Sequence, residues 1–332
     1  MAIAADQPIR WGVIGTGGIA ATFARDLALL PDAEIVAVGS RSQAGADAFA
    51  DRFAIGHRHS SYEALARDPE VDAVYVATPH PMHRDNALLA IQAGKAVLVE
   101  KPFTINAAEA AELIDAAKTQ GTFLMEAMWT RFLPHVVRIR ELIAAGRLGE
   151  LRSMTADHGQ WFPSNPEFRL FAPELGGGAL LDLGIYPLSF ASMLFGSPST
   201  VTAVSDKAMT GVDAQTAVVL QYVGGRQSVS FTTLETRTAN HASINGRDAR
   251  IEIDGVFYTP TTFSIIDRDG ATERVEIAHE GHGLRHQAAE VGRCLRAGLV
   301  ESPVMPQAET LSIMETLDEV RRQIGLRYPT EV

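Results

Sequence analysis

Short apolar runs alternate with helical segments through roughly the first 130 residues. Runs that are apolar throughout are typical of strands in a parallel sheet whose two faces are both covered. The segments between them carry helix formers, and several end at glycine or proline. The pattern predicts a doubly wound α/β domain, with strands at Ile9–Gly15, Glu34–Gly39, Val71–Ala77, Ala96–Val99 and Phe123–Met128, and helices at Ala21–Leu30, Gln43–Arg52, Arg84–Ala93 and Ala107–Thr119.

The rhythm changes to strict alternation between Val201 and Ile277. Gly224-Gly225 and Asp269-Gly270 separate alternating runs and are hairpin signals. This predicts a mostly antiparallel sheet with one face on a core and one face open. We therefore expect an N-terminal doubly wound domain over residues 1–130 and a C-terminal α+β domain over 131–332, with helices at Phe132–Gly146, Leu284–Ala297 and Gln307–Ile324.

Composition excludes several classes of protein. The chain has 332 residues, with 29 basic and 40 acidic side chains, and a net charge of −11 argues against a nucleic-acid partner. No apolar run approaches the roughly 20 residues of a membrane helix. Asp6 and Pro8 interrupt the N-terminus, which disfavours a signal peptide. Cys294 is the sole cysteine, so intrachain disulfides are excluded. These features together predict a cytoplasmic protein with no membrane partner.

A glycine-rich loop joins the first strand to the first helix. Its sequence, Gly15-Thr16-Gly17-Gly18-Ile19-Ala20, fits a dinucleotide-binding fingerprint with alanine in the third small position. The first glycine allows the tight turn, the second lets the backbone approach a pyrophosphate, and the alanine allows close packing of helix on strand. Phosphates are then expected at the positive N-terminal end of the helix. An ordinary glycine turn is the alternative, but the position between strand and helix favours the nucleotide site.

The end of the second strand indicates which nucleotide binds. NAD-binding folds place a carboxylate there, against the ribose 2′-hydroxyl. This chain has Ser40 and Arg41 instead, a hydroxyl and a guanidinium that suit a 2′-phosphate. The alternative is that Arg41 is an ordinary surface residue. We expect NADP as the cofactor.

Two further segments offer acid–base chemistry. Glu100-Lys101-Pro102 follows a strand at the edge of the sheet where ligands bind. Asp182 and Tyr186, four residues apart after a glycine triplet, share a face if a helix follows the glycines. A tyrosine phenol is a poor base unless a cation stabilises its phenolate, and Lys101 is the candidate cation. A solvated lysine and a half-buried tyrosine are the alternative interpretations.

Taken together, the Gly15–Ala20 loop, Glu100-Lys101-Pro102 and the Asp182-x-x-x-Tyr186 segment resemble the Gfo/Idh/MocA family of NAD(P)-dependent oxidoreductases, over essentially the whole chain. The resemblance is greatest to its dimeric dihydrodiol dehydrogenase and NADP-dependent xylose dehydrogenase group. It implies an N-terminal Rossmann domain and NADP preference. It also implies that Tyr186 is the acid/base, Lys101 its partner and Asp182 a substrate or proton-relay contact.

The same resemblance implies a homodimer that pairs through the open face of the second sheet. On that face we expect small serine and threonine side chains.

Other residues fall near the expected site. Thr78, His80 and His83 follow the Val71–Ala77 strand and are expected near the cofactor, together with Glu100 and Lys101. Backbone positioning is as good an interpretation of His80 as imidazole chemistry. Apolar sugar or diol faces pack on aromatic rings, which makes Trp129 and Phe162 substrate candidates, with Arg131 beside them; core packing is the alternative for Phe162.

No metal site is expected. His279-Glu280-Gly281-His282 is one residue too short for the zinc-binding HExxH helix, and its glycine opposes a helix there.

The predicted reaction is hydride transfer between NADP and the hydroxyl-bearing carbon of a small diol or sugar. A trans-dihydrodiol and an aldose such as xylose are equally compatible with the sequence. Reduction of a keto-sugar such as 1,5-anhydrofructose, or a glucose–fructose oxidoreductase reaction, remains an alternative within enzymes. A non-catalytic NADP-sensing protein is the alternative of another class, and the Lys101, Asp182 and Tyr186 set argues against it.

Overall fold

The computed structural model describes residues 7–331. Residues 1–6, including Asp6, on which the prediction about a signal peptide partly rests, lie outside the described part. The chain divides into two compact units, each discontinuous in sequence. The first unit comprises Met1–Trp129 and Gly281–Leu311, and the second comprises Thr130–Glu280 and Ser312–Val332. One boundary falls at Trp129/Thr130, and residues 281–311 group with the N-terminal part.

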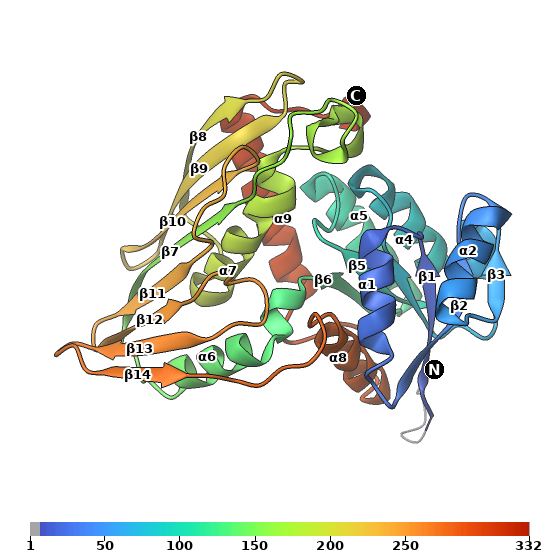
Figure 1. Cartoon of the computed structure of the whole chain (residues 1–332), viewed down its shortest axis with the longest axis horizontal. Coiled ribbons are helices and arrows are strands. Elements are labelled where there is room, and N and C mark those ends of the chain that lie inside the picture. The colour runs from blue at the N-terminus through green and yellow to red at the C-terminus, as the bar shows by residue number, and fades with distance from the viewer. Residues whose placement is uncertain (1–6, 332) are drawn as a thin grey trace. The chain divides into compact units, whose positions relative to one another are not determined.

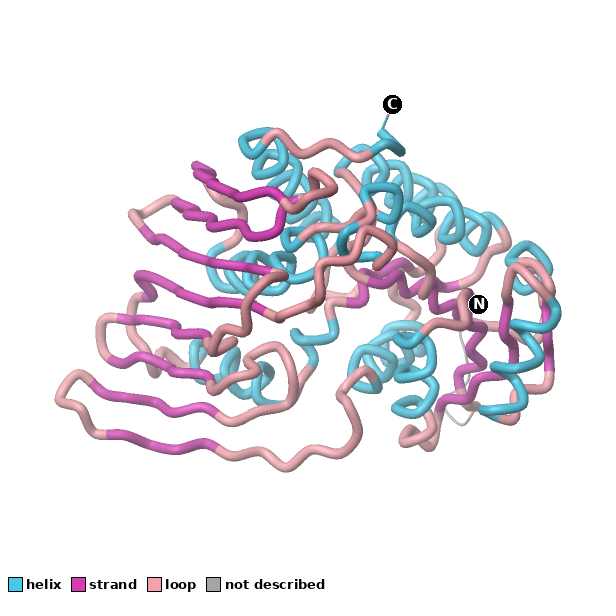
Figure 2. The backbone as a smooth tube through the Cα atoms, turned by 45° about the horizontal axis from the view of Figure 1, so that its top comes forward, coloured by secondary structure: helices cyan, strands magenta, loops and turns pink. Residues whose placement is uncertain are grey.

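The first unit contains a six-stranded parallel sheet in the order β3-β2-β1-β4-β5-β6 (Figure 1). Helices cover both faces of this sheet (Figure 2), as the doubly wound pattern predicts. The strands are β1 (Ile9–Ile14), β2 (Ala33–Gly39), β3 (His57–His59), β4 (Ala73–Val76), β5 (Ala96–Glu100) and β6 (Leu124–Ala127), and the helices are α1 (Gly18–Leu27), α2 (Gln43–Phe53), α3 (Tyr62–Ala66), α4 (His83–Gln92), α5 (Ala107–Gln120) and α8 (Arg285–Arg296).

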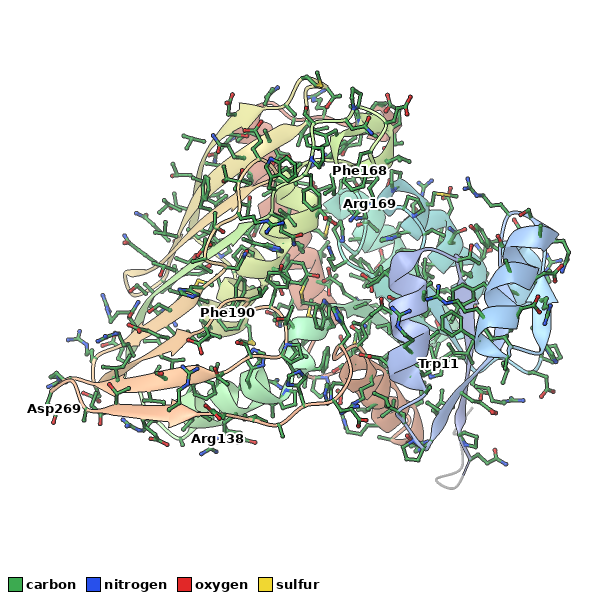
Figure 3. The ribbon with its side chains drawn as sticks, viewed as in Figure 1. Trp11, Arg138, Phe168, Arg169, Phe190 and Asp269 are labelled. Atoms are coloured by element: carbon green, nitrogen blue, oxygen red, sulfur yellow. The ribbon has the colours of Figure 1, made fainter. Side chains whose placement is uncertain are left out.

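Aromatic packing joins α1 to the middle of this sheet. Trp11 of β1 meets Phe23 of α1 edge to face, with ring centroids 5.4 Å apart, and Phe23 stacks on Tyr75 of β4 at 4.0 Å (Figure 3 labels Trp11). All three are fully buried. Such pairs add to the burial of apolar area, so α1 is held firmly behind the loop that precedes it.

The second unit contains an eight-stranded sheet in the order β14-β13-β12-β11-β7-β10-β9-β8. Only the β7–β10 pair is parallel among its described pairings, so the prediction of a mostly antiparallel sheet is confirmed. The strands are β7 (Leu151–Gly159), β8 (Thr200–Lys207), β9 (Asp213–Tyr222), β10 (Arg226–Thr233), β11 (Ala242–Gly246), β12 (Ala249–Ile253), β13 (Phe263–Asp267) and β14 (Thr272–Val275).

Both predicted hairpins form in the second unit. Gly224-Gly225 connects β9 to β10, and Asp269-Gly270 connects β13 to β14. All three glycines have positive φ, which is the backbone region that tight hairpin turns need. The helices of this part are α6 (Pro134–Ala144), α7 (Ile185–Phe195) and most of α9 (Gln307–Ile324).

Helix α7 packs on β7 and β10, which defines the covered face of the second sheet. On β10 the residues directed to that face are Ser228, Ser230 and Thr232, which are buried. The open face carries Val229 and Phe231, at 45% and 36% exposure. The expectation of small serine and threonine side chains on the open face was therefore wrong for β10, because alternation places them on the core side.

One helical stretch, Pro173–Phe195, is long and apolar enough to cross a membrane by length and composition. The statement that no apolar run approaches that length was thus too strict. Within the described fold, 89% of the most apolar window of this stretch is buried, and it supplies core helix α7 of the second unit.

Candidate functional site

The glycine-rich loop follows β1 at the point where the strand order reverses between β1 and β4, which is where open α/β sheets bind ligands. Gly15 has φ +105°, and a Cβ there would lie 2.7 Å from the Ala77 carbonyl oxygen. At Gly17, which precedes α1, a Cβ would meet no atom within 4 Å. Gly15 therefore closes the turn against β4, and Gly17 leaves open space at the N-terminus of α1, as a pyrophosphate needs.

Ser40 and Arg41 lie just past the end of β2. The Ser40 side chain is buried against Gly45, where a Cβ would come within 2.6 Å of its hydroxyl oxygen. Its backbone N–H donates to the His59 carbonyl at 3.0 Å, which ties the end of β2 to β3. Arg41 is exposed. A fixed hydroxyl beside an exposed guanidinium fits a 2′-phosphate.

His83 holds two loops of this edge together. Its ring nitrogens lie 2.9 Å from the Pro102 carbonyl oxygen and 2.8 Å from that of Thr78. Full burial lowers the pKa of His83, against the opposing effect of these carbonyls. The ring is therefore engaged with backbone, which makes His83 a positioning residue. Thr78, itself buried, accepts a hydrogen bond from Asn86, and His80 is buried with its ring 5.7 Å from that of His83.

Lys101 follows β5 directly and precedes Pro102 through a cis peptide bond. The carboxylate of Glu100 is buried, accepts a hydrogen bond from the Tyr75 hydroxyl, and accepts the Lys101 backbone N–H at 3.1 Å. Glu100 thus fixes the backbone from which the Lys101 side chain leaves. The sequence assigns Glu100 to the cofactor site, and these contacts also connect its carboxylate to the backbone of Lys101.

Trp129 is stacked on His282, with ring centroids 5.0 Å apart. His282 belongs to a loop that the Asp26 carboxylate of α1 holds by accepting backbone N–H groups of His282, Gly283 and Leu284 at 2.6 to 2.8 Å. The sequence motif around His282 suggests only a metal ligand, and it gives no sign of this contact because Trp129 and His282 are far apart in sequence.

Asp182 and Tyr186 lie where a π-helical turn, Leu180–Gly184, runs into α7. Asp182 is held by Arg169, whose two terminal nitrogens each lie 3.2 Å from a different carboxylate oxygen (Figure 3 labels Arg169). The side chain of Asp182 is 8% exposed. A π turn alters the direction of side chains within a helix and is frequent at functional sites.

Asp213, at the start of β9, anchors this π-helical turn. Its Oδ2 atom accepts the Leu180 backbone N–H at 2.7 Å and the Thr216 hydroxyl at 2.8 Å. Complete burial raises the pKa of Asp213 to about 7, although both hydrogen bonds act to lower it. Gly178 has φ +119°, and a Cβ there would lie 2.1 Å from Asp213 Oδ1. The absence of a side chain at Gly178 therefore leaves room for the buried Asp213 carboxyl group next to the start of the π-helical turn.

Tyr186 lies in a polar aromatic cluster and is 7% exposed. Its ring is 4.8 Å from that of Tyr258 and 5.3 Å from that of His158, and the latter two rings stack at 3.9 Å. Gln160 donates to the Tyr258 hydroxyl at 3.0 Å and lies 3.0 Å from His158 Nε2. His158 Nδ1 lies 3.1 Å from the Leu183 carbonyl of the π turn. The phenol thus has both aromatic walls and polar neighbours.

The other two substrate candidates, Arg131 and Phe162, make packing contacts within the second unit. Arg131 is 2% exposed, and its guanidinium donates to the backbone carbonyl of Ser189 at 2.8 Å and to its hydroxyl. These contacts favour a role in holding α7. Phe162 is partly buried against a cluster of apolar side chains that includes Phe171 and Leu183.

The first unit contains the nucleotide loop, Ser40, Arg41, Lys101 and Trp129, and the second contains Asp182 and Tyr186. The sequence missed Arg169, His158, Gln160, Tyr258 and Asp213. His158 and Gln160 flank the end of β7, a strand that the pattern did not predict, and no local motif marks the other three.

Two family models match the chain. Residues 9–128 match an oxidoreductase family with an NAD-binding Rossmann fold, and residues 136–255 match the GFO/IDH/MocA C-terminal domain. Among curated relatives, trans-1,2-dihydrobenzene-1,2-diol dehydrogenase of Bos taurus is 37% identical, covering 97% of this chain and 99% of its own length. D-xylose 1-dehydrogenase (NADP(+)) of Hypocrea jecorina is 38% identical, and the match covers 97% of this chain and 93% of its own length.

Solved structures extend the similarity. The 3-ketoreductase KijD10 of Actinomadura kijaniata, in complex with NADP and TDP-benzene, has a TM-score of 0.84 at 28% identity, covering 96% of this chain and 98% of its own. Aldose-aldose oxidoreductase of Caulobacter crescentus, at 24% identity and a TM-score of 0.87, shares the fold and covers 96% of this chain and 97% of its own. The matched models, the relatives and the glycine-rich loop lead to one conclusion: the chain belongs to the Gfo/Idh/MocA family of oxidoreductases.

Proposed function

We propose that the protein is an NADP-dependent oxidoreductase that transfers hydride between the nicotinamide and a hydroxyl-bearing carbon of a sugar or a trans-dihydrodiol. The placement of Tyr186 carries the proposal, because a nearly buried phenol beside polar and aromatic groups suits proton exchange with a hydroxyl. The relatives support the substrate class, since one acts on a dihydrodiol and the other on xylose with NADP.

The residues of the first unit fit NADP. Gly17 leaves open space before α1. A side chain at Gly15 would clash with the Ala77 carbonyl group that follows β4. Ser40 and Arg41 would hold the 2′-phosphate by a hydroxyl and a guanidinium. When bound, the cofactor accepts or supplies the hydride. In this proposal His83 and Glu100 position the surrounding loops, and Thr78 lines the same edge.

Tyr186 exchanges the proton in the proposed mechanism. During oxidation its phenolate takes the proton from the substrate hydroxyl, and during reduction its phenol returns a proton to the carbonyl oxygen. A phenolate needs a neighbouring cation at neutral pH, and the ammonium group of Lys101 supplies it. Asp182, held by Arg169, binds a second substrate hydroxyl. Trp129 provides an apolar face for the ring.

The direct test compares Tyr186→Phe with Tyr222→Phe. Tyr222 is also buried in the second unit, where its hydroxyl lies 3.3 Å from Ser228, and it serves as the matched control. Turnover is measured at the nicotinamide absorbance with xylose, glucose, a trans-dihydrodiol and 1,5-anhydrofructose. We expect Tyr186→Phe to lose nearly all turnover and to retain NADPH affinity, and Tyr222→Phe to keep both. Substantial turnover of Tyr186→Phe contradicts the assignment.

The same panel tests the competing functions. The structural similarity to a 3-ketoreductase favours keto-sugar reduction as the second candidate, and NADPH oxidation by the keto-sugar alone would support it. NADPH binding without turnover on any member of the panel would support a sensing protein.

We also propose a cytoplasmic homodimer that pairs through the open face of the second sheet. The exposed apolar side chains of Val204, Val219, Val229 and Phe231 support this pairing. Sedimentation that shows only monomer at micromolar concentration contradicts it.

A further inference from the structure

Two histidines on the edge strand of the first sheet lie on one side of that strand. β3 is only three residues long and is the outermost strand of the sheet, with the sequence His57-Arg58-His59. Side chains two apart on a strand project to the same face. Arg58 projects to the other face, where it pairs with Asp51 at 2.7 Å. The sequence pattern indicates neither a metal site here nor the strand β3.

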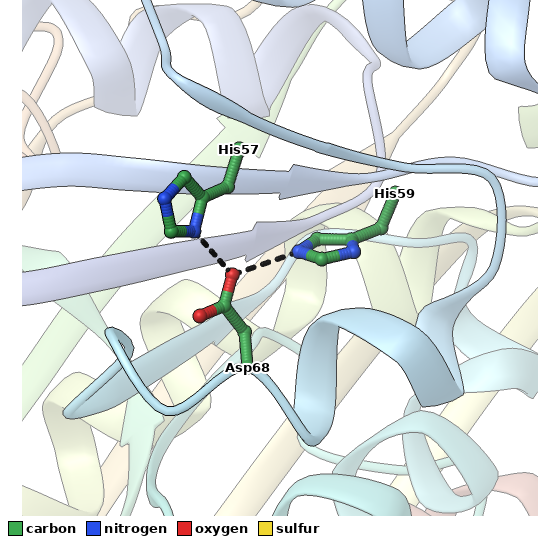
Figure 4. A group of neighbouring side chains, drawn as sticks. All are labelled: His57, His59 and Asp68. Atoms are coloured by element: carbon green, nitrogen blue, oxygen red, sulfur yellow. Dashed lines mark hydrogen bonds and ion pairs between the residues drawn. The ribbon is translucent and has the colours of Figure 1, made fainter.

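A buried carboxylate completes the cluster. His57 Nδ1 and His59 Nε2 lie 2.6 and 2.8 Å from the same oxygen, Oδ2 of Asp68, in the loop that follows α3 (Figure 4). Asp68 is 5% exposed, and its other oxygen accepts the Glu70 backbone N–H at 2.9 Å. That second contact fixes the direction of the carboxylate, as the outer hydrogen bonds of metal ligands do.

Asp68 directs its Oδ2 atom toward the two imidazoles. The nearby ammonium group of Lys95 is engaged elsewhere, since it donates at 2.7 Å to the backbone carbonyls of Asp68 and Val71.

The three candidate ligand atoms all lie within 4.8 Å of one another. Around a tetrahedral Zn²⁺ with bonds near 2.0–2.1 Å, ligand atoms are about 3.3 Å apart. To reach that geometry, each imidazole nitrogen moves outward from Asp68 Oδ2 by a fraction of an ångström, and the two nitrogens, which lie within 4.8 Å of each other, adopt the same spacing. His57 is 45% exposed, so an ion has a path from solvent and water can take a fourth position.

We propose that His57, His59 and Asp68 form a binding site for one divalent transition-metal ion, of the class that imidazole and carboxylate ligands hold, such as Zn²⁺. The ion links edge strand β3 to the loop before β4. Because the backbone carbonyl of His59 accepts the N–H of Ser40, the site borders the expected 2′-phosphate position. It is separate from the acid–base residues.

The test uses full-length protein without an affinity tag, with metal removed by chelation and dialysis. Zn²⁺ binding is followed by calorimetry, and Co²⁺ binding by its visible absorption. The variants are His57→Ala and His59→Ala, and the control is His241→Ala, which removes an exposed histidine from the second unit. We expect about one equivalent of Zn²⁺ to bind to the wild type and to the control, with affinity at least tenfold weaker in each of the other variants.

Thermal unfolding gives a second readout that does not depend on turnover. Zn²⁺ should raise the melting temperature of the wild type and of His241→Ala, since a ligand that binds only the folded state stabilises it. It should leave that of His59→Ala unchanged. Stoichiometric binding that persists in both site variants, or its absence from the wild type, overturns the proposal. In the latter case the cluster is a hydrogen-bonded link only.

Discussion

Arg169 and Asp182 form a two-pronged ion pair, with each terminal guanidinium nitrogen 3.2 Å from a different carboxylate oxygen. Arg169 is half exposed while Asp182 is almost buried, so the arginine covers the carboxylate from the solvent side. A bidentate pair fixes the rotation of the carboxylate as well as its position. Asp182 is thereby presented in one orientation at the start of the segment that carries Tyr186.

Removing Arg169 should impair catalysis through Asp182. We expect Arg169→Ala to lower kcat/KM by about 10- to 100-fold, because small displacements of a positioning group have effects of this size. NADPH affinity should not change. Arg169→Lys should restore activity partly, because lysine keeps the positive charge but cannot make the bidentate hydrogen bonds of the guanidinium. Steady-state kinetics check this, with Arg138→Ala as a control that breaks an exposed arginine–glutamate pair. Equal kinetics of Arg169→Ala and Arg138→Ala contradict the prediction.

Replacing Arg41 should change cofactor preference. We expect Arg41→Ala to raise the Kd of NADPH about tenfold or more, as the loss of a charge-assisted hydrogen bond implies, and to leave the Kd of NADH nearly unchanged. Fluorescence titration of both nucleotides measures this. Arg52→Ala, an exposed arginine at the end of α2, is the control. If the Kd of NADPH and that of NADH rise by the same factor in Arg41→Ala, the guanidinium does not bind the 2′-phosphate.

Asp213 should make the protein less stable at alkaline pH. Burial raises its pKa to about 7 from the usual value of about 3.8 for an aspartate, so folding favours the protonated carboxyl group. Its contribution is complete below about pH 4 and is lost as the pH rises toward 7. At roughly 1.4 kcal/mol per pKa unit, the loss amounts to about 4 kcal/mol.

The matched variant is Asp213→Asn, which is neutral at every pH. We expect its free energy of unfolding in urea, relative to the wild type, to increase by a few kcal/mol between pH 5 and pH 8. Asp206→Asn, at an exposed position of β8, should show no such increase. A difference between Asp213→Asn and the wild type that is independent of pH would show that the carboxyl group titrates normally.

The first sheet was largely predictable because its strands are buried on both faces and so read as continuous apolar runs. β3 and α3 were not predicted because each is very short and β3 is polar. β7 was not predicted because the residues of its first half are only partly buried and show no clear alternation of apolar and polar side chains. Pairing with β10 in parallel, across about 70 intervening residues, is what defines it.

The sequence offers candidate site residues where chemistry follows from a local motif, as at Gly15, Arg41 and Lys101. It offers none where a side chain acts through partners distant in sequence. Asp213 reads as the ordinary start of a strand, and only the fold places it under Leu180. Likewise the pattern placed Asp182 and Tyr186 on one regular helix, whereas a π-helical turn precedes Tyr186.

The hydrogen bonds from the backbone of residues 282–284 to Asp26 have a consequence for folding during synthesis. Asp26 emerges early during synthesis, whereas the backbone amides that satisfy its carboxylate come more than 250 residues later. A buried carboxylate without partners is costly. The nascent nucleotide-binding half therefore cannot reach its finished state until residues 282–284 have left the ribosome.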